Sequence, residues 1–252
     1  MSRGFGKSAL LAAALCALLS GCAQPPGVAA DKQNMNADSR LRVALAAEQS
    51  GDRDLAISMY LAAAEQAPND TVVLQRCTEG LARSGRLDEA AALLKRHMQS
   101  GAGRSDLMLT LGSIEVLAGQ PVQADTTLSE VLAARPDNVR ALTNRGIALD
   151  MEKRQADAQL LYRKALSLAP GDVAISNNLA LSLMLSGRSD EARKVLLPFR
   201  DVADLPERVR INLGIVEAAG GDHAGAQQLL SGSVNATDLA ALTRAIQLRA
   251  TP

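Results

Sequence analysis

The chain has 252 residues, of which 47% are apolar but only 2% aromatic, and it contains no tryptophan. This composition favours closely packed helices over a sheet-based core, so we expect an all-α protein. The formal net charge is zero, from 27 basic and 27 acidic residues, and nothing in the sequence suggests nucleic-acid binding.

The N-terminus has the pattern of an export signal. Arg3 and Lys7 precede an apolar run over residues 9–19, which is too short to cross a bilayer as a mature helix. The run ends in Leu-Ser-Gly-Cys, and this string resembles a bacterial lipobox, in which Cys22 receives the lipid. We therefore predict a lipoprotein signal peptide over 1–21; the alternative is an ordinary secretory signal in which Cys22 is incidental.

The next segment, residues 22–36, reads as a lipidated flexible tether, since AQPPGVAADKQNMN is small, polar and proline-containing. Three acyl chains on Cys22 would hold it far more firmly than the single chain of a myristoylated protein. No Asp follows Cys22, whereas an Asp there commonly retains lipoproteins in the inner membrane. We therefore expect the chain at the periplasmic face of the outer membrane.

A 34-residue period fills the rest of the chain. One column of the repeat is a turn position, occupied by Gly51, Gly85, Gly119, Lys153, Gly187 and Gly221. Five residues later stands an alanine column: Ala56, Ala90, Ala124, Ala158, Ala192 and Ala226. Glycine permits a left-handed turn between two helices, and only a small side chain fits where two helices cross closely.

This period resembles the tetratricopeptide repeat (TPR). Numbering each repeat from Ala37 and its equivalents, place 24 holds a large residue in every repeat: Tyr60, Leu94, Leu128, Tyr162, Leu196 and Leu230. The family's Trp at place 4 and Tyr at place 11 are missing, and Lys153 replaces one turn glycine. The resemblance implies an all-α, right-handed superhelical solenoid of about six TPR repeats over 37–240.

Residues 238–249 read as one more amphipathic helix, with Asp238 or Thr237 placed to cap its start. Solenoids need such a lid over the last apolar face. We expect the capping helix and tail to form the end of the chain, 241–252.

The first helix of each TPR pair lines a groove, and its place 6 offers the candidate partner-binding residues Arg42, Arg76, Asn144, Asn178 and Asn212. Asparagine is a poor helix-interior residue, and its amide can both donate to and accept from a peptide backbone. Two hypotheses follow: the three asparagines form a ladder that grips an extended peptide, or each bonds to a neighbouring helix or water.

Other side chains are expected on the same surface. Leu181, Met184 and Leu185 would favour a partner with an apolar segment, unless they are already buried against the adjacent helix. In the first two repeats, Arg42, Arg76 and Arg83 give a basic lining that Glu48 and Glu79 offset. That lining weakly favours an acidic segment as ligand.

We expect no enzyme, metal or cofactor. His97 and His223 stand alone, without a Cys or carboxylate at metal-ligand spacing, and no nucleophile motif is present. Cys77 falls on a predicted core face as a small apolar residue. The expected activity is protein binding.

The last two repeats, with NNLALSLMLSGRSDEARKVLLPF and LPERVRINLGIVEAAGGDHAGA, resemble the TadD family of TPR lipoproteins of the tight-adherence (Flp) pilus system. The resemblance implies a pilotin-like scaffold that binds the pilus secretin and assists its assembly. Alternatives are an accessory of another envelope machine (β-barrel insertion, type IVa pilus or polysaccharide export) and a regulatory subunit of an envelope enzyme. The sequence leaves the oligomeric state open.

Overall fold

The computed structural model describes residues 35–98 and 103–230. Within these ranges the chain forms twelve α-helices and one short 3₁₀ helix, with no strand. The helices make six successive pairs: α2 (Ala37–Ser50) with α3 (Arg53–Gln66), α4 (Thr71–Arg83) with α5 (Leu87–His97), α6 (Arg104–Leu117) with α7 (Pro121–Ala134), α8 (Val139–Met151) with α9 (Gln155–Leu168), α10 (Val173–Leu185) with α11 (Ser189–Leu196), and α12 (Glu207–Ala219) with α13 (His223–Leu230). The 3₁₀ helix η1 (Leu197–Phe199) continues α11. The all-α solenoid of six repeats is confirmed.

The turn inside every pair has the backbone conformation that the glycine column predicts. The six turn residues have φ values between 62° and 88°, and they are Gly51, Gly85, Gly119, Lys153, Gly187 and Gly221. Lys153 is the one described residue other than glycine with a positive φ. At Gly51 the backbone N–H bonds back to the carbonyls of Ala47 and Glu48, which ends the first helix.

The two helices of a pair pack against each other at the alanine column and, in three repeats, also where the large residue at place 24 meets a glycine. All six column alanines are fully buried. In three repeats the large residue at place 24 lies against a glycine of its partner helix. A Cβ on Gly112, Gly146 or Gly214 would lie 2.5–2.6 Å from the nearest side-chain atom of Leu128, Tyr162 or Leu230. Large side chains therefore fill holes that glycine leaves open.

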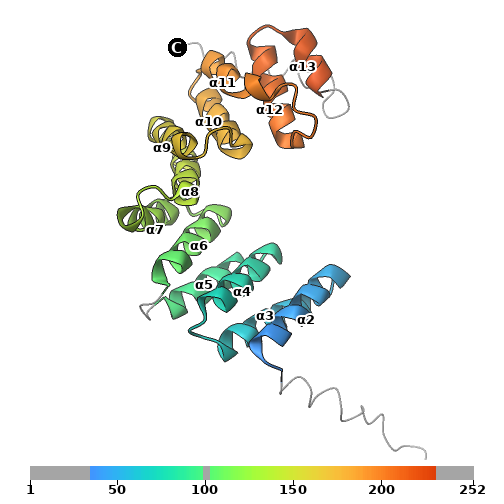
Figure 1. Cartoon of the computed structure of the whole chain (residues 1–252), viewed down its shortest axis with the longest axis vertical. Helices are drawn as coiled ribbons and strands as arrows, with labels where there is room; N and C mark the ends of the chain where they lie inside the picture. Colours follow the sequence, from blue (N-terminus) through green and yellow to red (C-terminus); the bar gives the residue numbers. More distant parts are fainter. Residues whose placement is uncertain (1–34, 99–102, 231–252) are drawn as a thin grey trace, which may run out of the picture.

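The first helices form a continuous row along the molecule. Each contacts the first helix of the following pair, in the order α2, α4, α6, α8, α10, α12, and also its own second helix. The pairs consequently follow one another along a curved, elongated stack (Figure 1). This arrangement leaves one face of the array to the first helices, as in other helical solenoids.

Several predictions concern residues outside the described ranges: the signal peptide, Cys22 and residues 22–34 of its predicted tether, and the helix over 238–249. They stay predictions. The last residue of that predicted tether, Asn36, caps the start of α2. None of the helices described in 35–98 and 103–230 combines the length and apolar character that crossing a membrane requires.

Candidate functional site

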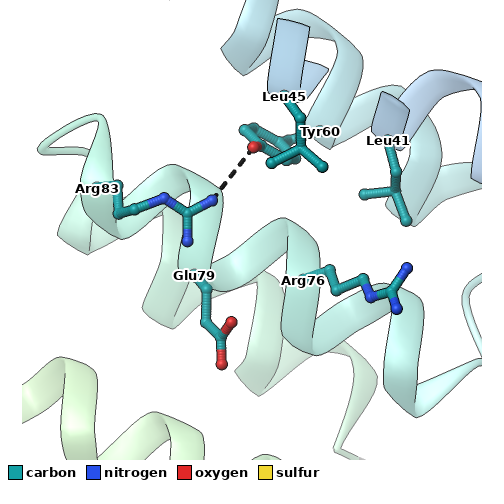
Figure 2. Close-up of a pocket in the computed structure, with 6 residues that line it drawn as sticks. All are labelled: Leu41, Leu45, Tyr60, Arg76, Glu79 and Arg83. Atoms are coloured by element: carbon teal, nitrogen blue, oxygen red, sulfur yellow. Dashed lines mark hydrogen bonds between the residues drawn. The ribbon is translucent and has the colours of Figure 1, made fainter. Parts of the chain in front are cut away.

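Two cavities open at equivalent junctions between repeats, and together they are lined by six of the side chains that the sequence places in the groove. The first-junction cavity, of about 210 Å³, lies between the first and second repeats. Its lining comes from α2, α3 and α4 (Figure 2): Leu41, Leu45, Tyr60, Arg76, Glu79 and Arg83.

Three polar side chains at the first junction, Glu48, Tyr60 and Arg83, bond to one another. The Tyr60 hydroxyl donates to Glu48 Oε2 at 2.8 Å. Arg83 donates from Nε to Glu48 Oε1 at 2.8 Å and from Nη2 to Oε2 at 3.1 Å. Its Nη2 also reaches the Tyr60 hydroxyl at 3.3 Å (Figure 2). This fork against a carboxylate is the geometry in which arginine binds most specifically.

The pKa values at the first junction follow from these bonds. The hydrogen bond from Arg83 holds the pKa of Glu48 below its usual range. Burial, followed by the bond to Glu48, raises the pKa of Tyr60 to about 12. Because Arg83 is engaged with Glu48, the basic lining expected in the first two repeats is reduced to Arg42 and Arg76.

The fourth-junction cavity, of about 330 Å³, lies between the fourth and fifth repeats. Its lining is mostly apolar and comes from α8, α9 and α10: Ile147, Asp150, Met151, Tyr162, Asn178, Leu181 and Leu185. Asp150 accepts from the Tyr162 hydroxyl at 2.9 Å through Oδ2 and from Ser182 Oγ at 2.6 Å through Oδ1. Burial raises the pKa of Asp150 above its ordinary value despite these two bonds.

The two cavities share most of their lining positions in the repeat. Five lining positions are shared, each pair three 34-residue periods apart: Leu45 and Ile147, Tyr60 and Tyr162, Arg76 and Asn178, Glu79 and Leu181, Arg83 and Leu185. Glu48, which bonds to Tyr60 and Arg83, is in the same way the counterpart of Asp150. The carboxylate and its tyrosine are kept. All three charged lining residues of α4 are replaced by uncharged residues in α10, two of them leucines.

Two members of the predicted asparagine ladder bond within the chain. Asn144 donates from Nδ2 to Ser113 Oγ at 2.7 Å, and Asn212 donates to Asn177 Oδ1 at 2.8 Å. Both bonds cross to the first helix of the preceding repeat. Asn178 instead lines the fourth-junction cavity. The alternative of bonds to a neighbouring helix therefore describes Asn144 and Asn212, and peptide binding by the ladder stays a prediction.

The remaining candidates take different positions. Leu181 and Leu185 line the fourth-junction cavity and are 42% and 49% exposed. Met184 is half-buried and packs against the core of the last repeats. Arg42 is exposed, and its Nη2 donates to Ser39 Oγ at 3.1 Å without lining either cavity. Cys77 is buried as a core residue, and burial raises the pKa of its thiol to about 12.

The pairing of Asp150 with Tyr162 is not among the residues predicted from the sequence, although the sequence carries a signal for it. The chain has two tyrosines, both at place 24, and each has a carboxylate twelve residues before it, Glu48 or Asp150. No other repeat has an acidic residue at that place. In the part of the chain that the structure describes, no three His, Cys, Asp or Glu side chains gather as metal ligands.

Comparison with known proteins gives one family match and one related sequence. Residues 81–145 match the family described as tetratricopeptide repeat. The protein y4yS of Sinorhizobium fredii is 35% identical over 104 residues, which are 41% of this chain. The matched region spans 57% of that relative.

Solved structures resemble the whole array. A tetratricopeptide repeat protein of Parabacteroides merdae has a TM-score of 0.65 at 13% identity, covering 87% of this chain and 89% of that one. PilF of Pseudomonas aeruginosa gives 0.62 at 18% identity, over 81% and 96%. PilW, described as a widely conserved type IV pilus biogenesis factor, gives 0.66 at 14% identity, over 84% and 98%. At these identities the likeness concerns the fold, a TPR-like solenoid.

Proposed function

We propose that this chain is an outer-membrane-anchored TPR scaffold that binds a segment of the Flp pilus secretin and assists assembly of the secretin complex. The observation that carries the binding role is the open, mostly apolar cavity at the fourth junction, on helices of a TPR-like solenoid. Such a surface suits an extended or amphipathic segment of another protein.

Two of the structural neighbours support a role in pilus biogenesis. PilW is described as a type IV pilus biogenesis factor, and PilF has a similar array. The resemblance of the last two repeats to the TadD family favours the Flp system among pilus systems. Because the array also resembles PilW and PilF, the second candidate function is that of an accessory protein of type IVa pili.

The proposed mechanism is physical and requires no turnover. A lipid on Cys22 would hold the array at the membrane, and the segment 22–36 would let it move within reach of its partner. Tethering raises the effective concentration of a captured segment, to the millimolar order for a short flexible linker. Secretin subunits captured by the anchored array would stay at the membrane surface, which would favour their assembly over their diffusion into the periplasm.

The anchor is tested by replacing Cys22→Ser and measuring secretin multimers on semi-native gels, together with surface pili. We expect both to fall, because the array would no longer be held at the membrane. Cys16→Ser is the matched control, since Cys16 lies within the predicted signal peptide and would be removed. Unchanged multimers in the Cys22→Ser strain would refute the pilotin-like role.

A pull-down from the same cells separates the two candidates. The Flp secretin is expected among the partners that the wild-type chain retains. If a type IVa secretin were recovered instead of the Flp secretin, the chain would be a scaffold of the type IVa pilus system and the Flp assignment would be wrong.

A further inference from the structure

The fourth-junction cavity contains a carboxylate for which the chain provides no cation. Among the described residues no ion pair involves Asp150, and its hydrogen bonds come from neutral hydroxyl groups of Tyr162 and Ser182. Each carboxylate oxygen has two lone pairs, so each can accept one further bond. Asp150 is also one of the residues that line the cavity.

The first junction shows which group completes this arrangement. There the equivalent carboxylate, Glu48, accepts the same tyrosine bond and also receives the guanidinium of Arg83. At the fourth junction Leu185 stands at the place of Arg83, so the guanidinium is missing and an apolar wall replaces it. Among the differences between the two junctions, the change from Arg83 to Leu185 is the one that removes the cation from the carboxylate.

We propose that the fourth-junction cavity binds an arginine side chain from an extended segment of a partner protein. Its guanidinium would pair with Asp150, as Arg83 pairs with Glu48, and its aliphatic stem would lie against Leu181 and Leu185. An arginine suits such a site because its stem is apolar while its planar head bonds a carboxylate through two donors. The proposal deepens the proposed function by naming the recognised side chain, and it rests on that function only for the identity of the partner.

Apolar residues should flank this arginine in the partner. The place of Leu185 is also apolar and exposed in the two preceding repeats, as Leu117, 65% exposed, and Met151, 44% exposed. These three side chains repeat along the row of first helices. An extended segment with its arginine at the fourth junction could therefore lay apolar side chains along the neighbouring repeats.

The test uses a pair of small probes that differ in charge and little in shape. N-butylguanidinium and N-butylurea are titrated into the full chain, and backbone amide shifts are followed by NMR. We expect N-butylguanidinium to shift amides of 147–151 and 181–185, with N-butylurea roughly tenfold weaker because it lacks the charge-assisted bond. Equal binding of the two probes, or shifts elsewhere only, would overturn the proposal; equal binding would indicate a purely apolar site.

Two variants assign the effect to the cavity. Asp150→Asn should remove the preference for N-butylguanidinium, and Leu185→Arg should abolish binding by supplying the cation from within the chain. Leu185 is half exposed, so arginine there is compatible with folding. Glu48→Gln, at the first junction, is the matched control and should leave the preference intact. A preference that survives Asp150→Asn would contradict the proposal.

The test of the arginine site can fail or succeed independently of the test of the proposed scaffold function. If secretin multimers depend on Cys22 but neither probe binds at the fourth junction, the arginine proposal fails and the scaffold role stands. If the probes bind as expected but multimers are indifferent to Cys22, the site is retained and its partner lies in another system.

Discussion

Glu48 and Asp150 occupy the same place in two repeats, yet their surroundings act on them in opposite directions. A hydrogen bond from Arg83 lowers the pKa of Glu48, whereas burial without a cation raises the pKa of Asp150. Both carboxylates accept a tyrosine hydroxyl, so the tyrosine does not explain the difference. The presence or absence of one guanidinium does, because an opposite charge favours the ionised form and desolvation disfavours it.

These shifts predict pH dependences of opposite sign. A lowered pKa in the folded state means that Glu48 stabilises the fold above its unfolded pKa, and this contribution is lost as pH falls through the folded value. A raised pKa means that Asp150 costs stability as pH rises from its unfolded pKa through its folded one. Urea unfolding from pH 3 to pH 7 should therefore show Glu48→Gln losing stability relative to wild type with rising pH, and Asp150→Asn gaining it. Parallel curves for all three proteins would contradict both assignments.

Lys153 is a second residue with a measurable consequence. It occupies the turn position that five glycines occupy in the other repeats, with φ of 62°. A left-handed backbone conformation costs a residue other than glycine about 1–2 kcal/mol. Glycine avoids this strain, but part of the gain is offset because glycine has more conformational freedom to lose on folding. Lys153→Gly should therefore stabilise the protein by about 0.5–1 kcal/mol in urea unfolding. Lys153→Ala, which keeps the strain, is the control and should give no comparable gain.

At the scale of the helix pair, the tyrosine rings require glycine at two different places. Tyr162 lies against Gly146 of its own pair, where an added Cβ would be 2.5 Å from the ring. Tyr60 lies against Gly80 of the next repeat, where the same distance would be 2.2 Å. The first repeat has Ala44 at the place of Gly146, and the fifth has Ser182 at the place of Gly80. Each tyrosine ring thus packs against a glycine, Tyr60 against Gly80 of the next repeat and Tyr162 against Gly146 of its own repeat.

Gly146→Ala should consequently destabilise the protein, by roughly 1–3 kcal/mol, because the buried Tyr162 ring would have to move in a packed core. Helix propensity alone predicts the opposite sign, since alanine is favoured over glycine by about 1 kcal/mol inside a helix. The free energy of unfolding in urea separates the two effects. A more stable Gly146→Ala protein would show that the ring has room to shift.

Much of the helix arrangement could be predicted from the sequence, because the features that set it recur with a fixed period. The turn at Gly51 and the crossing at Ala56 need small residues in every repeat, and these columns place the helices correctly. The candidate site depends on what differs between repeats. A search for positions that recur does not detect that Leu185 stands where the second repeat has Arg83. The hydrogen bond of Asn144 depends on how closely two helices approach each other. Side-chain partners across repeats therefore required the structure.

At the scale of the molecule, the main helix–helix contacts among the described residues lie within one repeat or between neighbouring repeats, so the array behaves as a series of coupled junctions. The last junction depends on a buried charge. The Glu217 side chain of α12 is 0% exposed, and it accepts from Arg193 Nε of α11 at 2.8 Å. Arg200 Nη1, just after η1, lies 3.5 Å from its other oxygen. Both arginines come from the fifth repeat, so this ion pair network joins the fifth repeat to the sixth.

Replacing Arg193 and Arg200 together by alanine should open the end of the array and leave its beginning intact. Glu217 would be left as a buried charge without a partner, which costs about 3–5 kcal/mol. Because stability in a solenoid is a sum over repeats and their interfaces, the loss should appear in α12 and α13 first. Hydrogen exchange followed by mass spectrometry should show faster exchange there and unchanged exchange in α2–α5. Arg86→Ala, which removes an exposed pair with Glu89, is the control and should change little. Uniformly faster exchange from α2 to α13 would instead mean that the six repeats unfold as one unit.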